Sequence, residues 1–116
     1  MTKQEIRIQT RIIHELSYFM MTYGYTSFSI TVENNQEETH FLLKMDHIKD
    51  ELLNRMKEKL NRQREIEVET YGFELVGDHD SRSEFEILSL LIDYMEVERT
   101  EDAVNLLLVR KSMYRK

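Results

Sequence analysis

Glu15 is the side chain in this sequence that is best placed to carry chemistry. It lies within the amphipathic segment 12–24, and a lone helix carboxylate is a candidate general base because it can accept a proton from a substrate. The simpler interpretation is an ion pair with Arg11, one helical turn earlier. Phe19, one turn later, offers no oxygen to a hard cation such as Mg²⁺, which requires oxygen ligands. Glu15 is therefore a candidate catalytic residue with no metal ligand at the next turn.

The remaining acids and histidines are scattered rather than convergent, whereas a metal site needs ligands at defined spacing. The best local cluster is Asp78-His79-Asp80, which we interpret as a solvated acidic loop. We interpret Asp50 with Glu51, and Asp93 with Glu96, as helix surface rather than as paired catalytic carboxylates. We predict no metal site and no cofactor. The histidines are His14, His40, His47 and His79.

Composition restricts the class of protein. A chain of 116 residues, with 41% apolar and 33% charged residues, is typical of one soluble globular domain spanning 1–116. It has no run of 18 apolar residues, so we predict no membrane span. It has no cysteine, and we expect a cytoplasmic protein. The net charge of −6 argues against nucleic-acid binding, and we interpret the basic tail 110–116 as a solvated terminus.

Apolar periodicity predicts the elements that must position these residues. Three- and four-residue spacing predicts helices over 4–23 and 48–60. Period-two alternation predicts strands over 25–32 and 39–45, joined by a polar turn at 34–37. We favour continuation of the second helix to residue 71, although 66–68 also alternates like a strand. Gly24 is the expected stop of the first helix.

The C-terminal part is predicted to contain one helix and one strand. The helix covers 84–95, after a loop at 77–81, with Ser81 or Ser83 as its cap. The turn 101–102 leads into a strand over 103–111, whose 106–109 segment is apolar on both faces and is therefore expected to be central. The predicted fold is an α+β two-layer sandwich. A small mixed or antiparallel sheet of three or four strands carries three helices on one face.

Two landmarks in the first half of the chain have a family counterpart. Glu15 is followed by Tyr23 and Gly24 at the end of its helix, and Asp46 follows the second predicted strand. Together with the order of the elements, these residues resemble the histidine-kinase-type ATPase fold (the GHKL or Bergerat fold), and most of all the small anti-sigma-factor kinases. The likeness runs over most of the chain. It implies an ATP site to which Glu15 and Asp46 are the candidate contributors. A generic α+β domain without such ancestry is the alternative.

The sequence departs from the family at the positions that hold ATP. Phe19 stands where the family has the Asn that binds Mg²⁺, and Ile48 replaces the Gly of the Asp-x-Gly motif. Ser83-Glu84-Phe85 occupies the place of the glycine loop that donates N–H groups to the phosphates. Glu84 would oppose phosphate there, since two like charges about 4 Å apart repel by about 4 kcal/mol at an effective dielectric of 20. We therefore expect no ATP binding in the family manner.

These departures favour a binding role over catalysis. The first expectation is a non-catalytic binding or regulatory module that acts through a protein partner. The alternatives are a small nucleotide-binding protein with altered contacts at Glu15 and Asp46, and a structural homodimer in which the long middle helix forms the interface. Phe19, at the lost metal position, is expected to be a core residue packed against Leu16, Tyr23 and the C-terminal helix.

Overall fold

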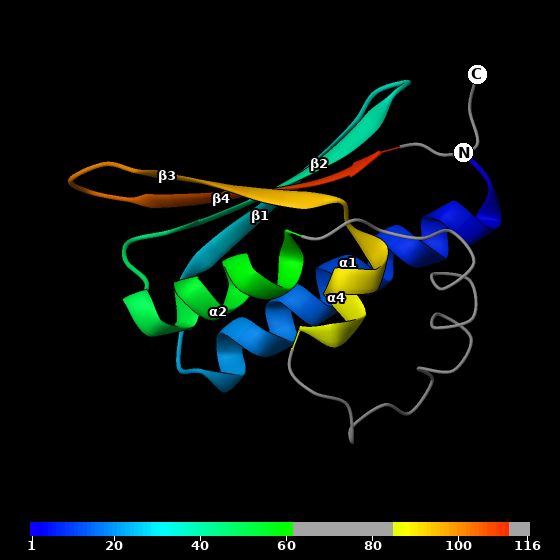
Figure 1. Cartoon of the computed structure of the whole chain (residues 1–116). Coiled ribbons are helices and arrows are strands. Elements are labelled where there is room, and N and C mark those ends of the chain that lie inside the picture. Colours follow the sequence, from blue (N-terminus) through cyan, green and yellow to red (C-terminus); the bar gives the residue numbers. More distant parts are fainter. Residues whose placement is uncertain (62–84, 112–116) are drawn as a thin grey trace.

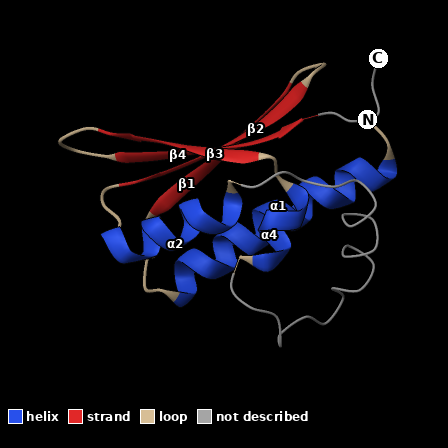
Figure 2. Ribbon diagram, in the orientation of Figure 1, coloured by secondary structure: helices blue, strands red, loops and turns tan. Residues whose placement is uncertain are grey.

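The computed structural model describes residues 1–61 and 85–111. In this part of the chain, a four-stranded sheet forms one layer and three helices form the other, as Figure 1 shows. Figure 2 gives the same view with helices and strands distinguished by colour. The predicted α+β two-layer fold is confirmed. The helices are α1 (Lys3–Thr22), α2 (Asp50–Leu60) and α4 (Glu86–Leu91). The strands are β1 (Phe28–Asn34), β2 (Glu38–Met45), β3 (Tyr94–Arg99) and β4 (Val104–Lys111).

The sheet is antiparallel throughout and joins two hairpins. Its strand order is β1-β2-β4-β3, so the β1–β2 hairpin and the β3–β4 hairpin meet along β2 and β4. In the register, Phe41 lies opposite Val32 on one side and Leu108 on the other. The prediction that the strand around 106–109 is central is confirmed, since β4 lies between β2 and β3.

Alternation along the strands directs one set of side chains toward the helices. On the central strands these residues are buried, and Phe41, Leu43, Leu106 and Leu108 are fully so. The helices contribute the facing half of the core through side chains spaced three and four residues apart. These are Ile8, Ile12, Leu16 and Met20 on α1, Leu52, Leu53, Met56 and Leu60 on α2, and Ile87, Leu88 and Leu91 on α4.

The last predicted helix is wrong in its second half. Helix α4 ends at Leu91, Ile92 is extended (φ −119°, ψ 160°), and Tyr94–Arg99 forms a strand. Ile92 and Met95 are three residues apart, which is the spacing of one helix face, so periodicity alone predicted a longer helix. The short connection at residues 100–103, where the Thr100 N–H donates to the Ala103 carbonyl, pairs β3 with β4 and decides the conformation. Asp93 and Glu96 therefore do not lie on a helix surface.

Helix α2 begins close to expectation, but the favoured unbroken helix to residue 71 is wrong at Asn61. Its last residue is Leu60, and Asn61 (φ −107°, ψ 51°) leaves the helical conformation while its side-chain oxygen accepts from the Met95 N–H. The rest of the predicted continuation to residue 71 lies outside the described residues, as do the loop 77–81 and both proposed serine caps.

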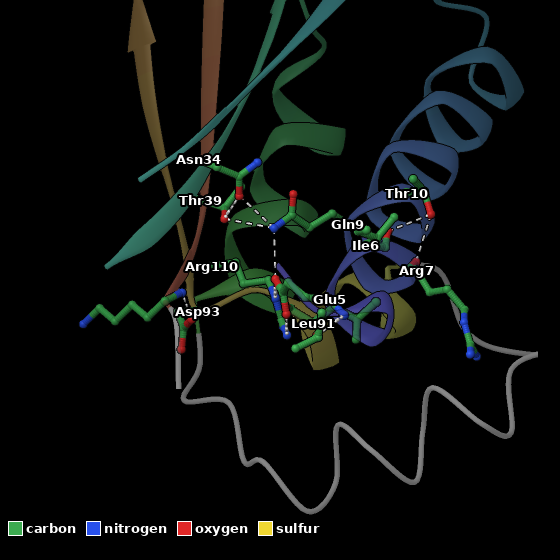
Figure 3. A network of polar contacts seen from close by, with 12 residues as sticks. Glu5, Ile6, Arg7, Gln9, Thr10, Asn34, Thr39, Leu91, Asp93 and Arg110 are labelled. Carbon is green, nitrogen blue, oxygen red and sulfur yellow. Dashed lines mark hydrogen bonds and ion pairs between the residues drawn. The ribbon is translucent and has the colours of Figure 1, made fainter. Parts of the chain in front are cut away.

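A buried ion pair joins the start of α1 to the end of β4. Figure 3 shows Arg110 donating to both carboxylate oxygens of Glu5, from Nε at 2.8 Å and from Nη2 at 2.9 Å. Its Nη1 donates to the Leu91 carbonyl at the end of α4. Arg110 is 2% exposed, so its assignment to a solvated tail was wrong. Period two along β4 gives the reason, because Arg110 continues the inward-facing series that includes Leu106 and Leu108.

Gln9 extends this network to the β1–β2 hairpin. Its amide Nε2 lies within hydrogen-bonding distance of Glu5 Oε2, Asn34 Oδ1 and Thr39 Oγ1 (3.0, 2.8 and 3.1 Å). The Thr39 hydroxyl in turn donates to Asn34 Oδ1 at 2.6 Å. Helix α1 is therefore fixed by polar contacts to both hairpins of the sheet and, through Arg110, to α4.

The two partners of the ion pair differ in exposure, which predicts an asymmetry between their mutants. Glu5→Ala leaves the Arg110 charge buried without its carboxylate, and we expect it to lower the free energy of unfolding by about 3–5 kcal/mol. Arg110→Met leaves a Glu5 side chain that is 18% exposed and reachable by water, so its cost should be smaller. Urea denaturation of each variant measures the difference, with the exposed Glu58→Ala as the control. Equal losses for both variants would contradict the burial argument.

Candidate functional site

Glu15 is buried and paired rather than free. Its side chain lies on the inner side of α1 and is 3% exposed, and Arg11 Nε donates to its Oε2 at 3.0 Å. The predicted pair with Arg11 is confirmed. The Glu15 side chain is more deeply buried than we expected for an ion pair on a helix surface. A carboxylate held by an arginine inside the protein is poorly placed to accept a proton from a substrate.

Asp46 lies at a different place, on the surface after β2. It lines a depression of about 180 Å³ together with Gly24, Tyr25, Ser27 and His47. Glu15 lies seven residues before the end of α1 at Thr22, about 10 Å along the helix axis at 1.5 Å per residue. It is not among the residues that line this depression. Gly24, with φ of +92°, ends α1 as predicted.

Phe19 contacts another residue that the resemblance had singled out. Its ring lies 4.8 Å, between centroids, from the ring of Phe85, and the two planes are tilted by 54°. Phe19 comes from the last turn of α1, whereas Phe85 precedes α4 and is fully buried. Phe19 itself is only partly buried, although it packs against the core as expected. Phe19 stands at the position of the family's metal ligand, and Phe85 stands at the position of its phosphate loop. In this structure the two positions contact each other through their aromatic rings.

Phe85 holds an unusual backbone conformation. Its φ of 64° and ψ of 4° lie in the left-handed region, which a bulky residue rarely adopts. Such a conformation costs about 1–3 kcal/mol and persists only where the surroundings impose it. The fully buried ring, packed against Phe19, is a constraint of this kind. Ile48, at the position of the lost motif glycine, is also a core residue, 6% exposed.

The histidines occupy separate surroundings. His14 stacks on Tyr18 along α1, His40 contacts Glu38 through Nε2 at 2.6 Å, and His47 lies edge-on to Tyr25. Within residues 1–61 and 85–111, no three histidine or acidic side chains converge as a metal site would require. Asp78, His79 and Asp80 lie outside the described residues.

Two of the remaining candidate acids, Asp50 and Asp93, make structural contacts. Asp50 accepts from Arg99 at 2.7 Å at the start of α2, and Glu51 is exposed beside it. Asp93 lies in the connection between α4 and β3, and its Oδ2 accepts from the Lys111 N–H at 2.6 Å. Each of these pairs ties an element to its neighbour.

A resolved pKa shift lies elsewhere, at Tyr94. Burial raises the pKa of the Tyr94 hydroxyl, and the carboxylates of Glu38, Glu96 and Asp93 raise it further. Tyr94 alternates with the buried Met95 and therefore lies on the face of the sheet away from the helices. The shift does not mark the region around Phe19 or Asp46.

Comparison with known proteins leaves the chain without an assigned family. No protein-family model, no curated protein and no solved structure matches it. In the part of the chain that the structure describes, no helix combines the length and apolar character needed to cross a bilayer.

The aromatic contact predicts the cost of removing Phe19. Because its ring is partly exposed, we expect Phe19→Ala to lower the free energy of unfolding by about 2–3 kcal/mol, below the 3–5 typical of a fully buried phenylalanine. The neighbouring Tyr18 is 58% exposed, so Tyr18→Ala should cost no more than about 0.5 kcal/mol. Denaturant unfolding of both variants gives the comparison. A loss below about 1 kcal/mol for Phe19→Ala would show that the contact with Phe85 contributes little.

Proposed function

We propose that this protein is a non-catalytic binding or regulatory module, built on a degenerate scaffold similar to the histidine-kinase-type ATPases, and that it acts through a protein partner. The observation that carries the proposal is the contact between Phe19 and Phe85. On the resemblance, these two positions would face Mg²⁺ and the phosphates of ATP. Two aromatic rings offer neither oxygen ligands to a hard cation nor donors to a phosphate.

The chemistry near these rings supports the same proposal. Glu15, the one acid of the resemblance that lies on the same helix, is engaged by Arg11 in the interior. Asp46 remains accessible and lines two open depressions, of about 180 and 320 Å³, and the larger only just reaches the 300–1,000 Å³ common for small-molecule pockets. A nucleotide-binding protein with altered contacts is the second candidate, and the exposure of Asp46 beside Gly24 is what favours it.

A surface suited to a protein partner lies on the outer side of α1. Tyr18 and Met21 are 58% and 60% exposed, and their three-residue spacing places them together on the helix surface. His14 stacks against Tyr18 and extends the patch by one turn. Tyrosine and methionine are enriched at protein interfaces, because each buries a large area and adapts to the partner's shape. This patch of His14, Tyr18 and Met21 is the partner surface that we propose.

Thermal melting tests whether a nucleotide site survives. A ligand present at 100 times its Kd stabilises a protein by about 2.7 kcal/mol, which would raise the Tm by several degrees. We expect no rise with millimolar Mg²⁺–ATP or Mg²⁺–ADP, because the positions of the cation and phosphate contacts are filled by phenylalanine. A dose-dependent rise that Asp46→Ala abolishes would instead support the second candidate. Asp46 is exposed, so that variant should fold normally.

The partner surface can be tested without knowing the partner. The double variant Tyr18→Ser/Met21→Ser should no longer capture the proteins that the wild-type chain captures from the native source. A few large side chains usually carry most of the binding energy of an interface, and this variant removes two of them. The control is Lys57→Ser/Glu58→Ser on the exposed side of α2, which should keep the same proteins. Circular dichroism must show both variants folded. Capture that survives in the α1 variant would rule out this patch as the binding surface.

A further inference from the structure

The two edges of the sheet differ in how they are protected. Strand β3 forms one edge and carries Glu96, Glu98 and Arg99, and Arg99 pairs with Asp50 of α2. Charges of this kind discourage the addition of another strand. Strand β1, with the sequence Phe-Ser-Ile-Thr-Val-Glu-Asn, forms the other edge of the described sheet. It contains a single charged residue, Glu33, no lysine and no proline. It is therefore the edge that can accept another strand.

The backbone groups that face this open edge follow from the hairpin. The Asn35 N–H donates to the Glu38 carbonyl, so Asn35 points toward β2. Because antiparallel strands alternate, Ser29, Thr31 and Glu33 also point their backbone groups toward β2. The N–H and C=O groups of the other residues then point outward, and these residues are Phe28, Ile30, Val32 and Asn34.

Apolar side chains gather beside this edge on the helix side of the sheet. Ile30 and Val32 face the helices but stay only partly buried. Gln9 of α1 contacts Asn34 at the end of β1, and Ile6 and Ile13 lie three residues before it and four residues after it. That spacing places both isoleucines on the same side of α1 as Gln9, the side nearest β1. Ile6 is 48% exposed and Ile13 is partly exposed.

We propose that β1 pairs with β1 of a second copy of this chain, antiparallel, about a two-fold axis at Thr31. Two four-stranded sheets then form one continuous sheet with all helices on the same face. In this register, Ile30 lies opposite Val32 of the second copy, and Phe28 lies opposite its Asn34. These are the residues whose backbone groups point outward, so each such pair exchanges hydrogen bonds.

The side chains of β1 suit this register. Thr31 meets its own equivalent on the outer face, and paired threonines are favourable neighbours across strands. Ile30 and Val32 form a β-branched pair on the helix face, beside Ile6 and Ile13 of both copies. Centring the axis on Thr31 is also the register that pairs the whole of β1 with itself.

The charges permit the same arrangement despite the net charge of −6 on each chain. Glu33 lies opposite Ser29 of the second copy rather than opposite another acid. The two Glu33 residues are about 14 Å apart along the strands, at 3.4 Å per residue. That separation exceeds the Debye length of about 8 Å at physiological ionic strength, so their repulsion is largely screened. This inference goes beyond the proposed function, because it uses β1 and not the His14, Tyr18 and Met21 patch.

Sedimentation velocity over a range of protein concentrations tests the inference, and substitutions on β1 test its register. The wild-type chain should show a monomer–dimer equilibrium. Ser29→Glu should weaken the dimer, because it places an acid opposite Glu33 of the second copy on both sides of the axis. We expect the dimer Kd to rise about ten-fold, which corresponds to about 1.4 kcal/mol. Within one chain Ser29 lies opposite Lys44, so Ser29→Glu should not harm the fold.

A charge reversal at Glu33 provides the rescue. The double variant Ser29→Glu/Glu33→Lys places opposite charges across the axis and should restore dimerisation to the wild-type level or above. Glu33→Lys alone, opposite an unchanged serine, is the matched control and should dimerise like the wild type. A wild-type chain that stays monomeric up to millimolar concentration would overturn the proposal. Association that Ser29→Glu does not weaken, or that the double variant does not restore, would do so as well.

Discussion

The Arg110 charge inside the protein constrains the arrangement of everything around it. A guanidinium removed from water must find acceptors for its N–H groups, and here they come from two helices. Glu5 supplies both carboxylate oxygens from the start of α1, and Leu91 supplies a carbonyl from the end of α4. The sheet strand that carries Arg110 is thereby fixed to both helices at once. Apolar packing alone would tolerate small shifts of α1 along the sheet, whereas these directional contacts do not.

The position of α1 determines which residues surround Phe19. With its first turns held by Arg110 and by Gln9, the helix presents Phe19 toward the start of α4, where Phe85 meets it. The interior charge and the aromatic pair thus lie at opposite ends of one rigid helix. The side chain at position 19 faces the core in this arrangement. A phenylalanine there contributes to packing but offers no oxygen ligand to a metal ion.

The sequence predicted the elements with unambiguous periods and missed those that depend on distant contacts. Helix α1 and the β1–β2 hairpin were predictable because their apolar spacing fits one period only. Strand β3 was not, since the three-residue spacing of Ile92 and Met95 favoured a longer helix, whereas the pairing with β4 makes this segment a strand. Arg110 was missed because its partner Glu5 stands at the far end of the chain, although its place in the alternation of β4 was visible. The Arg11–Glu15 pair was predictable from spacing, but its burial was not.

The strand order also bears on how the chain reaches this structure. Each hairpin closes through a short turn, so β1–β2 and β3–β4 can form early and independently. Joining β2 to β4 closes a loop that contains α2 and α4. Closing this loop costs conformational entropy before the contacts of the shared core can offset it. We therefore expect the pairing of β2 with β4 to limit the folding rate. The loop-closure cost rises only about 0.6 kcal/mol for each doubling of loop length, so the connection between the halves is free to vary in length during evolution.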